Sequence, residues 1–90
     1  MADTGTPLTI LYFAWLREHV GAAGEELPLP PSVRTVADLV EHLAARGPRH
    51  AAAFANRRSV RCAVNQEFAP VTTLLQPGDE VAFFPPVTGG

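Results

Sequence analysis

The chain has 90 residues, of which 47% are hydrophobic and 18% are charged, and its formal net charge is −2 at pH 7. This length suits one small domain, and this composition excludes an intrinsically disordered chain. Nucleic-acid binding is not expected, because it needs clustered cations and the one arginine cluster (Arg57, Arg58 and Arg61) is interpreted as a solvated loop. With no apolar run near ~20 residues and no signal-peptide pattern, we expect no membrane association and a cytoplasmic protein.

Cysteine and histidine usage gives no sign of a metal site. The single cysteine, Cys62, excludes an internal disulfide and is expected to be a packing residue in a strand, not a catalytic thiol. His19, His42 and His50 have no partner at ligand spacing and are interpreted as solvated or capping residues. No metal and no bound cofactor are therefore expected. All seven cations are arginine, so any amine chemistry must come from another protein.

The first third of the chain predicts two strands. Residues 1–7 are small and polar and are predicted to form a flexible leader. Residues 8–15 are rich in β-forming side chains and predict a strand, followed by a short irregular or helical turn over 16–20. Residues 25–29 predict a second strand. Because Pro28 cannot donate a backbone hydrogen bond, this strand is expected at a sheet edge.

The middle of the chain predicts the main helix. Thr35 followed by Asp38 resembles a capping box at a helix start, and Gly47-Pro48 ends the helix. Between them, apolar residues recur at helical spacing and predict one buried stripe, made of Val36, Leu39, Val40 and Leu43. Residues 51–54 predict a further short helical turn.

The last third predicts three short strands. Residues 60–64 form the first, Asn65-Gln66 a turn and residues 67–69 a return strand. A second turn at 76–79 precedes the last strand, 80–84. The order of elements predicts an α+β roll, in which one main helix crosses one face of a mixed sheet.

The first and last strands are apolar on both faces. A sheet covered on one face should alternate apolar with polar residues, yet residues 10–15 and 81–84 are apolar in both phases. The side chains on one face of these strands should pack under the helix. The chain has too few residues to cover the side chains on the other face. The uncovered phase therefore predicts a docking surface for a partner. Phe83 and Phe84 are consecutive, so only one of them can pack under the helix.

The residues after the last strand suggest a carrier arm. A stiff Pro85-Pro86 pair leads to Gly89-Gly90, and glycine lets a main chain pass through a narrow channel. A terminal carboxylate, once activated as an acyl-adenylate, can react with sulfide to give a thiocarboxylate or with an amine to give an amide. We therefore expect a folded body over 8–84 with a projecting tail over 85–90, and favour this over a frayed end.

Three segments carry a resemblance to a known family. Residues 78–90, 11–18 and 63–66 closely resemble the MoaD family of ubiquitin-like sulfur carriers, the small subunits of molybdopterin synthase. The resemblance covers about residues 8–90. The ending Phe-Phe-Pro-Pro-Val-Thr-Gly-Gly is specific to this family, whereas Gly-Gly alone would also suit thiamine-pathway carriers and ubiquitin-like modifiers.

The resemblance implies a β-grasp fold and a sulfur-carrying Gly90. In this family an E1-like adenylyltransferase (MoeB-like) uses ATP to adenylylate the terminal glycine, and a sulfur donor protein supplies the sulfur of the thiocarboxylate. The tail then enters the large subunit (MoaE-like) of a heterotetramer and delivers sulfur to precursor Z, cyclic pyranopterin monophosphate. The inserted residues match Pro85, Pro86, Val87, Thr88 and Gly89. The family's apolar contact with the large subunit matches Phe13, Phe68 and Phe84.

Two alternatives remain at this stage. The chain could carry sulfur for another pathway, such as thiamine or cysteine biosynthesis, with the same chemistry and a different acceptor. It could also be a modifier that is joined to lysines of target proteins. The specific ending favours the synthase subunit, which donates sulfur but is not catalytic alone.

Overall fold

The fold is described by a computed structural model over residues 5–86. The strands are β1 (Leu8–Tyr12), β2 (Gly24–Leu27), β3 (Arg61–Val64), β4 (Glu67–Phe68) and β5 (Glu80–Phe84). The helices are α1 (Ala14–Val20), α2 (Val36–Ala44) and α3 (Pro48–Ala53), with a 3-10 helix η1 (Arg57–Ser59) before β3. Within residues 5–86, no helix is long and apolar enough to span a membrane.

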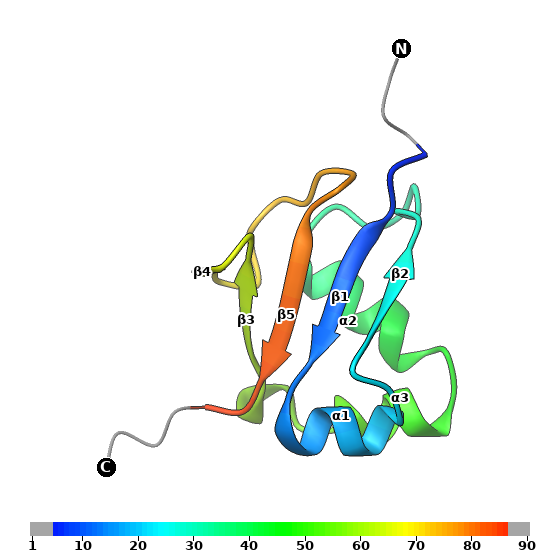
Figure 1. Ribbon diagram of the computed structural model, residues 1–90, viewed down its shortest axis with the longest axis vertical. Helices are drawn as coiled ribbons and strands as arrows, with labels where there is room; N and C mark the ends of the chain where they lie inside the picture. Colours follow the sequence, from blue (N-terminus) through cyan, green and yellow to red (C-terminus); the bar gives the residue numbers. More distant parts are fainter. Residues whose placement is uncertain (1–4, 87–90) are drawn as a thin grey trace.

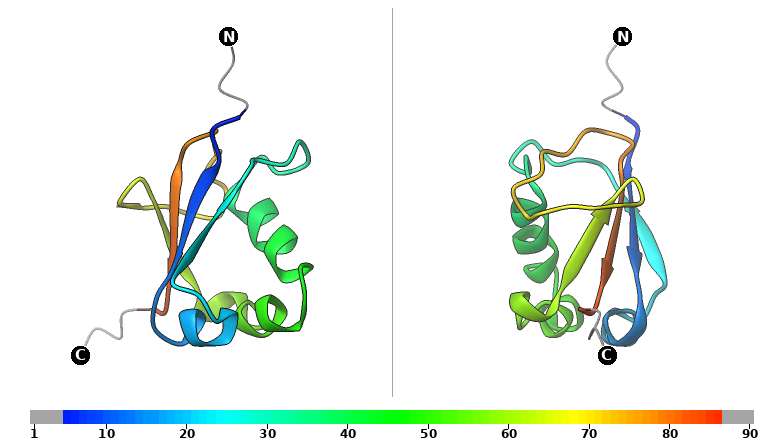
Figure 2. Two further views of the ribbon diagram at one scale, coloured as in Figure 1. Left: turned by 45° about the vertical axis from the view of Figure 1, so that its right-hand side comes forward. Right: turned by 90° about the vertical axis from the view of Figure 1, so that its left-hand side faces the viewer.

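The strands form one mixed sheet in the order β2-β1-β5-β3-β4. The central pair, β1 and β5, is parallel, and the other pairs are antiparallel. Helix α2 covers one face of the sheet, while α1 and α3 lie at the end where β1 and β5 finish (Figures 1 and 2). The predicted α+β roll with one main helix across one face is confirmed.

The first predicted strand is too long, because α1 begins within it. β1 ends three residues before Trp15, which lies in the seven-residue helix α1. Leu16 and Val20 are one helical turn apart and both are buried, so packing overrides the β propensity of the aromatic residues. Gly21 ends the helix in the left-handed conformation (φ 87°), and its N–H donates to the Arg17 carbonyl at 2.8 Å.

The capping box and the buried stripe of α2 are confirmed. The Asp38 N–H donates to Thr35 Oγ1 at 3.2 Å, and the Thr35 N–H donates to Asp38 Oδ2 at 3.1 Å. All four stripe residues are buried. Pro48 follows α2 and is also the first residue of α3, a position at which the missing N–H of proline costs nothing. Helix α3 therefore begins three residues earlier than the short turn predicted over 51–54.

The chain between β3 and β4 reverses in a tight hairpin. Asn65 and Gln66 both have positive φ angles, 53° and 71°, as a two-residue hairpin turn requires, so the predicted turn is confirmed. The Glu80 N–H donates to Asn65 Oδ1 at 3.0 Å, which ties the hairpin to the start of β5. The strand bounds differ from the predicted ones by one or two residues, and β2 ends before Pro28 at the sheet edge as predicted.

The core lies between the sheet and α2. Phe83 is completely buried there, and its ring centroid lies 5.0 Å from that of Phe54 and 6.3 Å from that of Tyr12. Leu8, Ile10 and Tyr12, the alternate residues of β1, are also buried. These buried side chains are the ones that the sequence pattern of the two central strands predicts on the helix-covered face.

Candidate functional site

The face of the sheet opposite α2, called here the outer face, has an apolar centre that no described element covers (Figure 2). The register places Leu11 beside Ala82, Ala82 beside Ala63, and Ala63 beside Phe68, across four strands. A shallow hollow runs over this face. Its apolar lining consists of Leu11, Phe13, Ala63, Phe68, Ala82 and Phe84.

The three phenylalanines predicted for partner docking come together in this hollow. Phe13 is 47% exposed and Phe68 is 80% exposed, while Phe84 is half-buried. The Phe68 and Phe84 ring centroids are 5.7 Å apart. Exposed aromatic groups clustered on a small domain usually mark an interaction surface. Their position fits the predicted docking role, which stays a prediction.

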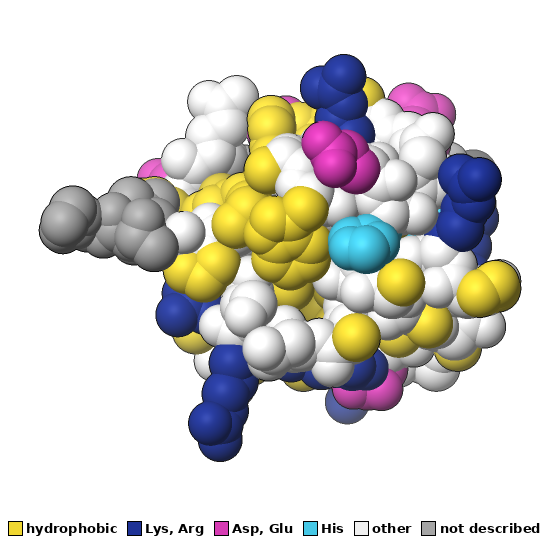
Figure 3. All heavy atoms as spheres, turned by 90° about the horizontal axis from the view of Figure 1, so that it is seen from below, with side chains coloured by type: hydrophobic (Ala, Val, Ile, Leu, Met, Phe, Trp, Pro, Cys, Tyr) yellow, Lys and Arg dark blue, Asp and Glu magenta, His cyan; other side chains and the backbone are white. Residues whose placement is uncertain are grey.

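The hollow lies beside the start of the predicted tail. β5 ends at Phe84, and the half-buried Pro85 and Pro86 follow it directly (Figure 1). The Phe13 N–H donates to the Phe83 carbonyl at 3.0 Å, which holds Phe13 next to the end of β5. From this end, hydrophobic side chains are seen gathered with arginine side chains nearby (Figure 3). Val87, Thr88, Gly89 and Gly90 lie outside the described residues.

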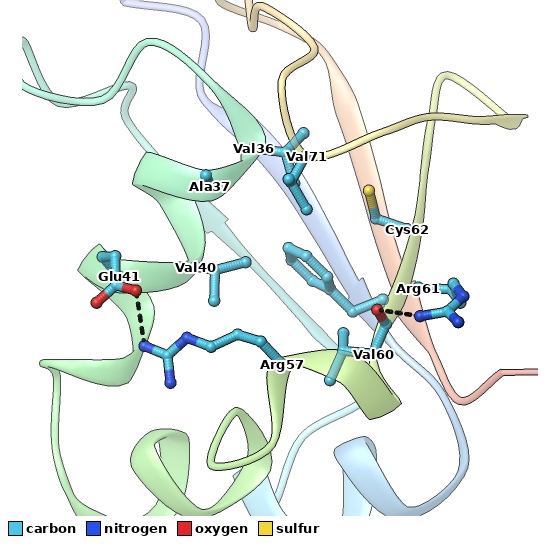
Figure 4. Close-up of a pocket in the computed structure, with 10 residues that line it drawn as sticks. Val36, Ala37, Val40, Glu41, Arg57, Val60, Arg61, Cys62 and Val71 are labelled. Atoms are coloured by element: carbon cyan, nitrogen blue, oxygen red, sulfur yellow. Dashed lines mark hydrogen bonds and ion pairs between the residues drawn. The ribbon is translucent and has the colours of Figure 1, made fainter.

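Cys62 lies on the other face of the sheet, away from the hollow. It is buried, its Sγ donates to the Ala69 carbonyl at 3.1 Å, and burial raises the pKa of its thiol. It borders an apolar pocket of about 160 Å³ between α2 and β3, where Val36 and Val71 also lie (Figure 4). Within residues 5–86, no three metal-binding side chains gather around it or elsewhere. The geometry supports the packing role predicted for Cys62.

Replacing Cys62 with alanine should cost about 1 kcal/mol of folding free energy and leave sulfur transfer largely intact. The lost contacts are one weak hydrogen bond and the packing of one sulfur atom. Chemical denaturation and a sulfur-transfer assay measure the two quantities. Complete loss of transfer by a well-folded variant would show that Cys62 takes part in a sulfur relay.

A polar cluster that the sequence does not predict lies at the β2 edge of the sheet, on the face covered by the helices. Glu25 of β2 accepts hydrogen bonds from the Tyr12 hydroxyl at 2.7 Å and from Arg46, and His50 Nε2 lies 2.8 Å from Glu25 Oε2. His50 is thus a partner of a carboxylate, and its interpretation as a solvated or capping residue is wrong. Burial disfavours the charged form of Glu25, but the bonds to His50, Tyr12 and Arg46 outweigh it and lower its pKa. The cluster positions Tyr12, which stacks on Phe83.

Glu25→Gln should lower the folding free energy by about 1–2 kcal/mol near pH 7. Because the folded pKa of Glu25 lies below its ordinary value of 4.5, the stabilisation by the carboxylate is present above pH 4.5. It should disappear as the pH falls through the folded pKa. Denaturant unfolding of both proteins between neutral and acidic pH measures this difference.

Glu26→Gln is the matched control, since Glu26 is the exposed neighbour of Glu25 in β2. Its stability difference from the parent protein should be small at every pH. If the Glu25 difference grew as the pH fell below 4.5, where the carboxylate itself titrates, the sign of its pKa shift would be wrong.

Comparison with known proteins identifies the family of this chain. The family model described as the ThiS family matches residues 10–90, which include most of β1, the residues of the hollow and the tail.

The chain belongs to the ThiS family.

Individual ThiS-family relatives agree with the resemblance noted in the sequence. The molybdopterin synthase sulfur carrier subunit of Escherichia coli (strain K12) is 42% identical and covers 92% of this chain and 99% of its own length. A solved Pyrococcus furiosus structure, described as a candidate molybdopterin converting factor, subunit 1, has a TM-score of 0.73, with 32% identity over 91% of this chain and 99% of that one. The small archaeal modifier protein 1 of H. volcanii has a TM-score of 0.72, with 26% identity over 92% of this chain and 100% of that one. The MoaD resemblance and the ubiquitin-like β-grasp fold are confirmed.

Proposed function

We propose that this chain is the sulfur carrier subunit of a molybdopterin synthase, and that Gly90 carries the sulfur as a thiocarboxylate. The observation that carries the proposal is the 42% identity across 99% of the E. coli sulfur carrier subunit. The placement of the apolar hollow at the start of the tail supports it, because a carrier must dock on its partner and insert its end at the same time.

The loading chemistry requires two steps. The Gly90 carboxylate attacks the α-phosphate of ATP on an activating enzyme, and pyrophosphate leaves to give an acyl-adenylate. Sulfide-level sulfur (HS−), supplied by a donor protein, then attacks the acyl carbon, displaces AMP and leaves a thiocarboxylate. ATP is a substrate of the activating enzyme here and not a cofactor of this chain.

The transfer step uses the thiocarboxylate as a tethered nucleophile. Sulfur is softer and more nucleophilic than the carboxylate oxygen, and holding it in a channel replaces a bimolecular encounter with a positioned one. The sulfur bonds to a carbon of precursor Z, and water then cleaves the bond between that sulfur and the Gly90 carbonyl carbon, which returns a carboxylate. The dithiolene of the molybdopterin product needs two sulfurs, so two loaded carriers deliver in succession. The large subunit supplies the cationic groups for the substrate, which fits the absence of lysine from this sequence.

The alternative acceptors are less favoured. The modifier relative in H. volcanii shares 26% identity with this chain, against 42% for the E. coli sulfur carrier subunit. A protein modifier would form an amide with a lysine where a sulfur carrier returns a free carboxylate.

Incubating the thiocarboxylate form with precursor Z and the large subunit tests the proposal. Molybdopterin should form, and the same chain with a plain carboxylate end should form none. Isopeptide adducts without molybdopterin would support the modifier instead. Intact mass, in which one oxygen is replaced by sulfur, verifies the loaded form before each assay.

A further inference from the structure

Two exposed arginines, Arg58 and Arg61, lie near the end of the sheet where the tail begins. Arg61 of β3 is paired in register with Phe84 of β5 and therefore lies on the outer face. Arg58 lies in η1, just before β3, and both residues are exposed. The cluster is solvent-exposed as expected, but its arginines lie in η1 and β3 and not in a loop, and only Arg61 is placed beside Phe84 by the register.

The charges of these two arginines are not neutralised within the described chain. Arg57, the third member of the cluster, pairs with Glu41 at 3.0 Å. By contrast, Arg61 Nη1 donates only to the backbone carbonyls of Arg58 at 2.9 Å and Val60 at 3.4 Å. Within residues 5–86, neither Arg58 nor Arg61 has a carboxylate within 4.0 Å.

The opposite end of the outer face is acidic. Thr9 of β1 lies between Glu26 of β2 and Glu80 of β5 in the register of the sheet. Glu80 and Phe84 are the first and last residues of β5, so the acidic and cationic rows are roughly 13 Å apart along the strands. The outer face thus runs from acidic residues, across an apolar hollow, to Arg61 and the nearby Arg58, neither of which is paired with a carboxylate within residues 5–86.

We propose that Arg58 and Arg61 dock against carboxylates on the large subunit, at the rim of the opening that receives the tail. This inference rests on the proposed function. Charge polarity along the face sets the orientation of docking, because a partner rotated end for end would meet like charges. The hollow supplies the apolar contact, and the arginines select the orientation in which the tail points into the partner.

A carboxylate rim does not conflict with a cationic reaction site in the same partner. Six tail residues, 85–90, span at most about 20 Å when extended. A fully extended tail would therefore place its end more than two Debye lengths from the arginines, because the Debye length at physiological ionic strength is about 8 Å. The arginines therefore interact with the rim and not with the site where an anionic substrate is bound.

The test is the affinity for the large subunit at two salt concentrations. Arg58→Glu combined with Arg61→Glu should raise Kd by about 10- to 100-fold at about 0.05 M NaCl, and by much less at about 0.5 M, because salt screens exposed charges. Arg61→Gln, which removes the charge without reversing it, should give a smaller rise with the same salt dependence. Thermal melting verifies that each variant is folded.

Arg34→Glu is the control for net charge. Arg34 is exposed and precedes α2, which covers the opposite face of the sheet. It should change Kd by less than about twofold. The single reversal Arg61→Glu changes the net charge by the same amount as Arg34→Glu and is measured beside it. An equal effect of the two, or an effect that salt does not reduce, would overturn the inference. If the parent chain does not bind the large subunit at all, the proposed function fails and this inference with it; if Phe84→Ala weakens binding but the arginine variants do not, only this inference fails.

Discussion

Removing Gly90, or adding one residue after it, should abolish sulfur transfer and leave the fold unchanged. Either change moves the terminal carboxyl by about 3.5 Å relative to the docked body. A positioned nucleophile tolerates much less, and a displacement of about 1 Å already costs roughly 100-fold in rate. Every strand and helix and the described core are made by residues 8–84, so thermal melting should be unaltered.

The measurement separates loading from delivery. A preformed thiocarboxylate, made by cleaving an intein fusion with sulfide, bypasses the activating enzyme, and single-turnover formation of molybdopterin then reports delivery alone. An extra glycine before Met1 is the matched control, because it lengthens the chain equally without moving the reactive end. Normal transfer by a chain extended beyond Gly90, with no trimming seen by mass, would overturn the mechanism.

Phe84→Ala should weaken binding to the large subunit by roughly 2–4 kcal/mol, or at least about 30-fold in Kd. Phe84 lies in the outer hollow against Phe68, and its truncation removes an aromatic anchor from the proposed interface. Because Phe84 is only half-buried in the free chain, the melting temperature should barely change. Calorimetric titration and thermal melting give the two values.

Phe83→Ala should do the reverse and is the matched control. Phe83 is 0% exposed and packs on Tyr12 and Phe54, so its truncation opens a core cavity and should cost about 3–5 kcal/mol of folding free energy. In the fraction that remains folded, affinity for the large subunit should be close to that of the parent. If Phe84→Ala unfolds the chain while Phe83→Ala only weakens the complex, the assignment of the two faces is wrong.

The sequence was sufficient for features that depend on local spacing. The Thr35–Asp38 capping box and its apolar stripe identify α2, and Asn65-Gln66 identifies the hairpin, because each needs only neighbouring residues. The two-phase apolar pattern of the central strands also predicted the uncovered face. The end of β1 could not be predicted, since β propensity and helical packing compete there and the buried Leu16 and Val20 decide the outcome.

Features that depend on strand register could not be predicted. The Glu25 cluster joins residues 13 to 25 positions apart, and no spacing rule connects them. The place of Arg61 beside Phe84 follows from the pairing of β3 with β5, which the sequence does not specify. The resemblance to the MoaD family predicts a docking role for Phe13, Phe68 and Phe84. Only the order of the strands explains why these side chains meet in one hollow.

The central position of β5 has a consequence for synthesis on the ribosome. β5 contributes the last 5 residues of the folded body, yet it lies between β1 and β3, so the sheet is split in two until it is added. A nascent or truncated chain that lacks these residues cannot complete the core or form the hollow. The hollow therefore exists only on molecules translated at least through Phe84.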